Sequence, residues 1–203
     1  DDFETICDIE FQYDAEEKTL TQLTTYIVEN ADTPDEIDAY GCWYDMFIYA
    51  GEPVIVEPVE APEGLETSTY LFTAQALENG YDDFEDYSAQ LQVGSDGQDV
   101  YFQGIATDVP NLWVKGTLSE DGKTVTIPAN QYMGQYSVLW FKYDYYFTAV
   151  DPETEELTDV VLNYDAETNT FSTDQMLALN GSKRALDYYL LYTDVNITKL
   201  IEV

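Results

Sequence analysis

The stretch from residue 97 to residue 134 constrains the fold of this chain more than any other part of it. It contains two runs rich in strand-forming residues, 112–118 and 123–127, with a short polar loop between them. Gly122 in that loop can adopt a positive φ, and Pro128 ends the second run because it has no N–H to donate. Apolar residues and threonines alternate between the two faces of the second run. This stretch therefore predicts a β-meander.

Alternating apolar and polar residues recur along the rest of the chain. Turn chemistry between these runs predicts four hairpin turns, at Asp14–Lys18, Gly94–Gly97, Ser119–Gly122 and Asp165–Asn169. The aromatic run over 137–150 predicts one long strand. Two acidic or polar segments, 78–87 and 184–191, could each form a helical turn.

These patterns indicate an all-β protein. The 18 tyrosines and 9 phenylalanines favour sheets over helices. We predict an antiparallel meander that forms a calycin-like barrel, because closure removes exposed sheet edges. A two-sheet β-sandwich is the alternative.

The Pro-containing segment 57–67 interrupts the strand pattern and suggests a division of the chain. We predict an N-terminal hairpin segment over 1–58, a linker over 59–67 and a main domain over 68–203, with packing into a single domain left open. Residues 11–21 resemble residues 162–172 in sequence, each reading as strand, Asp-led turn and strand. This similarity predicts that the two hairpins are copies of one unit, the first being truncated.

The charge and composition exclude several functions. The net charge of −34 repels nucleic acid and anionic membranes, which both need basic contacts. The absence of histidine removes the Ser-His triad and most zinc sites. No apolar run is long enough to span a membrane as a helix. The two cysteines, Cys7 and Cys42, leave both a disulfide and two free thiols open.

Several motifs carry a resemblance to a protein group. They are Pro62–Thr67, Asp99–Gly104, Pro110, Trp113–Thr117, Val125–Pro128 and Tyr164–Phe171. In these residues the chain resembles uncharacterised, exported cell-envelope proteins of Bacteroides-type gut bacteria. The resemblance implies export, by a lipoprotein route whose acylated cysteine and lipid anchor would lie upstream of this chain. It implies no particular activity.

Carboxylates and tryptophans supply the candidate site residues. Glu78, Asp82, Asp83 and Asp86, together with Glu85, form an acidic segment that is a candidate calcium site. The spacing is not that of an EF-hand, so a solvated acidic loop is the alternative and no cofactor is otherwise predicted. Trp43, Trp113 and Trp140 are candidate ligand-binding residues, because indole rings suit sugar rings and peptide grooves. Filling of the β core is the alternative.

We therefore expect an exported or cell-surface binding or structural module, with a glycan or a protein as ligand and no catalysis. A carboxylate-based hydrolase acting on glycans is the alternative, since glycoside hydrolysis needs two carboxyl groups and no histidine. No pair among the 41 acids stands out by motif, so no catalytic residue is assigned.

Overall fold

The computed structural model describes residues 10–15, 19–23, 26–29, 39–43, 47–49, 56–138, 141–182 and 185–201. The chain divides into two compact units, Asp1–Ile55 and Val56–Val203, so the division lies close to the predicted boundary at residue 58. Every regular element in the described part of the chain is a β-strand. The all-β prediction is confirmed. Residues 56–66 carry no strand and belong to the second unit.

The described residues of the first unit form two small antiparallel sheets. The strands are β1 (Phe11–Asp14), β2 (Thr19–Gln22) and β5 (Phe47–Tyr49) in the order β1-β2-β5, and the pair β3 (Tyr26–Glu29) and β4 (Ala39–Trp43). Cys42 lies in β4, whereas Cys7 lies outside the described residues. The choice between a disulfide and two free thiols therefore stays open.

The two hairpins with similar sequences pair in the same local register. Asp14 is paired with Thr19 in the first hairpin, and Asp165 is paired with Thr170 in the second. Their surroundings differ, because Tyr13 is 62% exposed whereas Tyr164 is half-buried and stacks on a phenylalanine with ring centroids 4.5 Å apart. The shared register agrees with the sequence similarity, and duplication stays a prediction.

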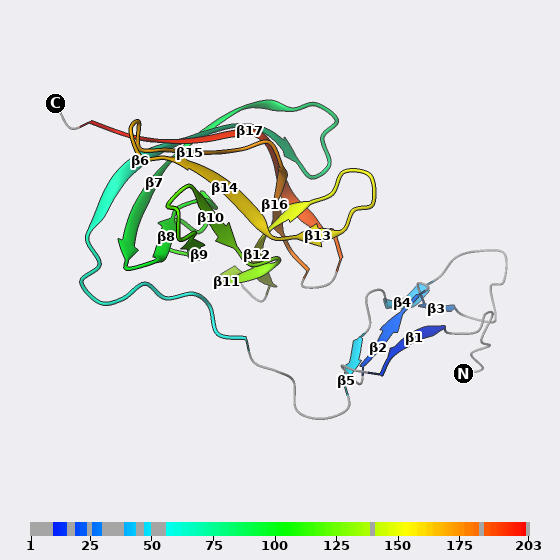
Figure 1. Ribbon diagram of the computed structural model, residues 1–203. Coiled ribbons are helices and arrows are strands. Elements are labelled where there is room, and N and C mark those ends of the chain that lie inside the picture. The colour runs from blue at the N-terminus through cyan, green and yellow to red at the C-terminus, as the bar shows by residue number, and fades with distance from the viewer. Residues whose placement is uncertain are drawn as a thin grey trace. The chain divides into compact units, whose positions relative to one another are not determined.

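The second unit holds twelve strands in one antiparallel sheet, shown in Figure 1. The first six are β6 (Thr67–Glu78), β7 (Glu85–Asp96), β8 (Asp99–Gln103), β9 (Trp113–Leu118), β10 (Thr124–Ile127) and β11 (Gln131–Val138). The other six are β12 (Phe141–Val150), β13 (Leu157–Thr158), β14 (Val160–Asp165), β15 (Thr170–Thr173), β16 (Met176–Asn180) and β17 (Tyr188–Lys199).

Eight of these strands close into a barrel. Neighbours pair in the order β6, β7, β8, β9, β10, β14, β15 and β17, and β17 pairs back with β6. The ring is antiparallel throughout, as expected for a calycin-like barrel, and the barrel prediction is confirmed. The alternative of a two-sheet sandwich is not formed.

A bulge in β17 makes the barrel wall fork. One edge of β17 pairs with β6 along most of its length, with a register shift between Thr193 and Asn196. Asp194 within this shift has a φ of 54°. The other edge pairs with β16 before the bulge and with β15 after it. A bulge bends its strand, so β17 can pair with β15 in the barrel and with β16 outside it. The branch β16-β12-β11 therefore leaves the barrel at one end.

The barrel interior is filled by side chains. Alternate residues of β6 point inward, and Phe72 is fully buried against Tyr192 of β17 with ring centroids 5.3 Å apart. Val125 and Ile127 of β10 are both fully buried, as the alternation in the sequence predicts. Burial of such side chains is the main stabilising contribution to a fold of this kind.

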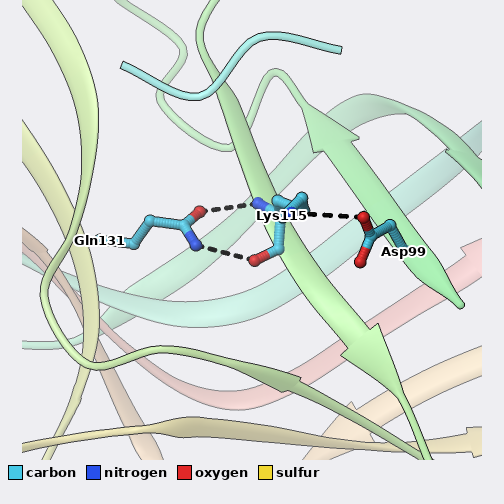
Figure 2. Close-up of polar contacts among 3 residues, drawn as sticks. All are labelled: Asp99, Lys115 and Gln131. Carbon is cyan, nitrogen blue, oxygen red and sulfur yellow. Dashed lines mark hydrogen bonds and ion pairs between the residues drawn. The ribbon is translucent and has the colours of Figure 1, made fainter. Parts of the chain in front are cut away.

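A side-chain amide replaces strand pairing along part of β9. β10 pairs with only the last residues of β9, which leaves the backbone of Lys115 without a strand partner on that side. Figure 2 shows the amide of Gln131, the first residue of β11, accepting from the Lys115 N–H at 2.7 Å and donating to the Lys115 carbonyl at 2.8 Å. The Lys115 Nζ lies 3.3 Å from an Asp99 carboxylate oxygen, an exposed pair that contributes little stability.

Two expectations from the sequence are wrong. The turn expected at Gly94–Gly97 lies further along, because Asp96 pairs with Asp99 and only Gly97 and Gln98 stand between them. Gly94 lies in β7, paired with Thr67 and Tyr101, and it has no side chain because a Cβ there would lie 2.6 Å from the Glu66 carbonyl oxygen.

The expected single strand over 137–150 is instead the β11–β12 hairpin, in which Val138 pairs with Phe141. No Gly or Pro marks this reversal, and strand-forming aromatic residues continue through it, so the sequence pattern does not indicate a turn. The helical turns left open over 78–87 and 184–191 do not form in the described residues, since β6 runs to residue 78, β7 begins at residue 85 and β17 begins at residue 188. In both places, pairing with neighbouring strands outweighs the local signal.

Candidate functional site

A pocket of about 900 Å³ opens at the end of the barrel where β6 ends and β7 begins. Its volume lies within the range of about 300–1,000 Å³ that is usual for ligand sites. Three parts of the second unit form its walls: the β6–β7 hairpin, the connection between β8 and β9, and residues of β12, β16 and β17. The fork in the wall places β12 and β16 here, since both belong to the branch that leaves β17 before its bulge.

The rim of the pocket is acidic. Six carboxylates line it, namely Glu78, Asp82, Asp83, Glu85, Asp86 and Asp108, and all six residues are exposed. The described residues that line the pocket include no Lys or Arg. Such a concave acidic surface with apolar walls concentrates the field and attracts cations.

The inner wall is aromatic. Tyr145 of β12 is 6% exposed, and the ring of Tyr189 of β17 lies against it with centroids 4.9 Å apart. The Tyr189 hydroxyl donates to the backbone carbonyl of Asp144 at 3.2 Å. Burial raises the pKa of Tyr189 to about 12 and also raises the pKa of Tyr145. Both phenols are therefore neutral at physiological pH, and the two rings give the pocket an aromatic wall.

The connection between β8 and β9 holds Asp108 at the pocket by burying its neighbours. Ile105 is 2% exposed and Ala106 is 1% exposed, so both belong to the barrel core. Val109 is also buried, and its N–H donates to the Ala106 carbonyl at 3.1 Å. Thr107 and Asp108, which lie between these anchors, are exposed and line the pocket. The loop therefore places a carboxylate at the pocket on a rigid base.

The loop between β6 and β7 forms the opposite rim. The Asn79 N–H donates to the Tyr189 carbonyl at 3.0 Å, which ties the start of this loop to β17. Further along, Tyr81 is 66% exposed and Phe84 is 41% exposed. Exposed aromatic rings beside a pocket are typical of a surface that binds a ligand.

The structure brings the predicted acidic residues together at this pocket. Glu78, Asp82, Asp83 and Asp86 all line it. Within the described part of the chain, no group of three or more His, Cys, Asp or Glu side chains is arranged to hold a metal ion. Calcium binding by the acidic segment stays a prediction.

Of the three predicted tryptophans, Trp113 is the one whose side chain lies in the described part of the chain. Trp113 is half-buried and packs edge-to-face on Tyr101 with ring centroids 6.4 Å apart, and it does not line the pocket. Trp140 and the side chain of Trp43 lie outside the part of the chain that the structure describes.

Sequence reasoning missed Asp108, Tyr145 and Tyr189. One signal could have found Asp108: the connection between β8 and β9 is long for a meander and contains Pro110, and long connections in compact domains are usually functional. No local signal marks the two tyrosines, because the chain contains 18 tyrosines in similar contexts.

Comparisons with protein-family models, with curated proteins and with solved structures yield no match to this chain. Among the described residues, there is also no helix with the length and apolar character needed to cross a membrane.

Proposed function

We propose that this chain is an exported or cell-surface binding module that holds its ligand, a protein or a glycan, in the pocket at the end of the barrel without catalysing a reaction. The pocket of about 900 Å³ is the observation that carries the proposal. Its walls come from strands and from an anchored loop, so it is formed before a ligand arrives. The acidic composition and the resemblance to exported cell-envelope proteins support the location.

The charge of the pocket favours a basic protein segment over a neutral glycan. Six carboxylates surround tyrosine rings, and Arg and Lys side chains can pair with the former and stack on the latter. Arg is the best fit, because its planar guanidinium does both at once. The exposed rings of Tyr81 and Phe84 widen the contact surface beyond the pocket, as suits a peptide chain.

Binding to a variant with a filled pocket tests this proposal. Thr107 is an exposed lining residue, and Thr107→Trp places an indole in the pocket without touching the barrel core. Ala166→Trp, at an exposed position in the β14–β15 turn, is the matched control. A labelled Arg-rich peptide and a panel of neutral glycans are titrated into each protein by fluorescence anisotropy and calorimetry.

We expect saturable binding of the peptide to the wild type and to the Ala166→Trp variant, and loss of binding to the Thr107→Trp variant. A glycan that binds in the same pattern would assign the pocket to glycans instead. Equal binding of every ligand to all three proteins would contradict the proposed pocket.

Carboxylate-based hydrolysis has no observation of its own in its favour. A general acid needs a carboxyl group whose pKa is raised. The carboxyl groups with a shifted pKa in the described residues are Asp121, Asp151 and Asp165, and all three shifts are downward. Hydrolysis therefore remains a hypothesis from the sequence alone.

A further inference from the structure

The chain contains two Asn-Gly pairs, Asn79–Gly80 and Asn180–Gly181, in contrasting surroundings. Asparagine followed by glycine is prone to deamidation, because no Cβ shields the backbone nitrogen that follows. That nitrogen attacks the side-chain carbonyl carbon, an N–C bond forms, and the C–N bond to the side-chain nitrogen breaks with release of ammonia. Water then opens the resulting succinimide ring to aspartate or isoaspartate. The reaction requires that the amide and the nitrogen are free to meet and that water has access.

Asn180 meets neither requirement. It is fully buried at the end of β16. Its Nδ2 donates to the carbonyls of Ser182 at 2.6 Å and Ala185 at 2.9 Å, and its Oδ1 accepts from the Asp187 N–H at 2.7 Å. The attacking group is also held, because the Gly181 N–H donates to the Asp187 carbonyl at 2.6 Å. The side-chain amide and the attacking nitrogen are therefore both restrained.

Asn79 meets both requirements. It is exposed, and it directly follows the last residue of β6. Within the described part of the chain, no hydrogen bond is made by the Asn79 side-chain amide or by the Gly80 N–H. Gly80 has a φ of 92°, and no atom lies within 4 Å of the position that a Cβ would occupy. The space beside the Gly80 Cα is therefore open.

We propose that Asn79 is a site of spontaneous deamidation and that Asn180 is protected by the fold. The product adds a carboxylate to the six that line the pocket, since Asn79 is itself a lining residue. An isoaspartate would also lengthen the backbone between β6 and β7. This inference is independent of the proposed ligand, because it rests only on the exposure and hydrogen bonding of the two amides.

Peptide mapping by mass spectrometry tests the proposal on the full chain. The folded protein is incubated at mildly alkaline pH, and each Asn-Gly peptide is followed for the mass change that replaces NH₂ by OH. We expect Asn79 to convert roughly tenfold faster than Asn180 or more, because Asn180 reacts only when the fold opens. The Asp-Gly pairs at 96–97 and 121–122 can isomerise without a change in mass, so they do not disturb this readout.

The same chain unfolded in denaturant is the control. There both pairs should convert at comparable rates, because both have glycine as the next residue. Asn79→Gln should abolish the mass change in the first peptide and leave the second unchanged. Equal rates for Asn79 and Asn180 in the folded protein would overturn the proposal, and so would an Asn79 that persists when folded but converts when unfolded.

Discussion

The acidic residues of the hairpin turns and those of the pocket look alike in sequence and differ in what surrounds them. In the turn after β12, the Asp151 carboxylate accepts from the N–H groups of Glu153 at 2.8 Å and Thr154 at 3.1 Å. In the β14–β15 turn, the Asp165 carboxylate accepts from the Glu167 N–H at 2.8 Å. These backbone hydrogen bonds stabilise the ionised form and lower the pKa of both groups.

The pocket carboxylates make few such contacts. Asp86 accepts a hydrogen bond from the Gln75 side chain. Asp82, Asp83 and Asp108 are exposed and make no hydrogen bond within the described part of the chain. A cluster of acidic residues in the sequence therefore does not by itself indicate a ligand-binding site. A carboxylate used by its own turn is structural, whereas one that faces a pocket without a partner is available to a ligand.

Neutralising pocket carboxylates should have the largest effect of all, and the effect should be on binding. We expect Asp82→Asn, Asp83→Asn and Asp108→Asn together to weaken binding of an Arg-rich peptide by about tenfold or more, which corresponds to about 1.4 kcal/mol. The matched control is Glu153→Gln, Glu155→Gln and Glu156→Gln in the exposed loop after β12, with the same change in net charge. Equal weakening in a calorimetric titration would show that the peptide follows net charge and not the pocket.

Alanine substitutions should separate the two groups by the sign of their effect on stability. Asp165→Ala removes the acceptor that the turn needs, so we expect the melting temperature to fall by a few degrees. Asp82→Ala removes a carboxylate from a chain of net charge −34, so relief of repulsion should leave the melting temperature unchanged or raise it. Calorimetry on both variants measures the difference, and a fall of similar size in both would remove the distinction.

The stability of the wild type should depend on pH in two ways, through repulsion among the exposed carboxylates and through the hydrogen-bonded carboxylates of the turns. As pH falls from 7 toward about 5, partial protonation reduces the repulsion among carboxylates, so we expect a small gain in stability. The pKa values of Asp121, Asp151 and Asp165 are lower in the folded protein than in the unfolded chain. Their contribution is therefore present above the unfolded value of about 4 and is lost as pH falls through the folded pKa.

Thermal melts across this pH range measure the effect. The Asp165→Ala variant should lose less stability than the wild type below about pH 4, because it lacks one of these groups. An identical loss of stability at low pH in the two proteins would argue against a structural role for the Asp165 carboxylate.

Calcium should have the smallest effect. Where carboxylates are only solvated, calcium and sodium salts at equal ionic strength should stabilise the protein equally at pH 7, by screening repulsion. Magnesium serves as a second divalent control in the same melts. A large rise in melting temperature with sub-millimolar calcium alone would instead identify the segment 78–86 as a metal site.

Features that depend on neighbouring residues could be predicted from the sequence. Alternation with a period of two placed Val125 and Ile127 on the buried face, and Pro128 ended β10 as expected. The turns over 119–122 and 165–169 followed from Gly, Asn and Asp at the positions that turns require. The acidic segment 78–86 was also visible in the sequence as a candidate site, although its place at the rim of a pocket was not.

Features that depend on pairing between strands far apart in the chain could not be predicted from the sequence. The bulge at Asp194 lets β17 pair with β6 on one edge and with both β15 and β16 on the other, and this fork places Tyr145 and Leu179 at the end of the barrel. Asp108 joins the acidic segment because buried residues anchor the connection between β8 and β9, and residue 94 is glycine because a distant part of the chain leaves no room for a side chain there. Periodicity and turn chemistry act within a few residues, whereas the pocket is made by contacts between residues that are far apart in the chain, which no local pattern encodes.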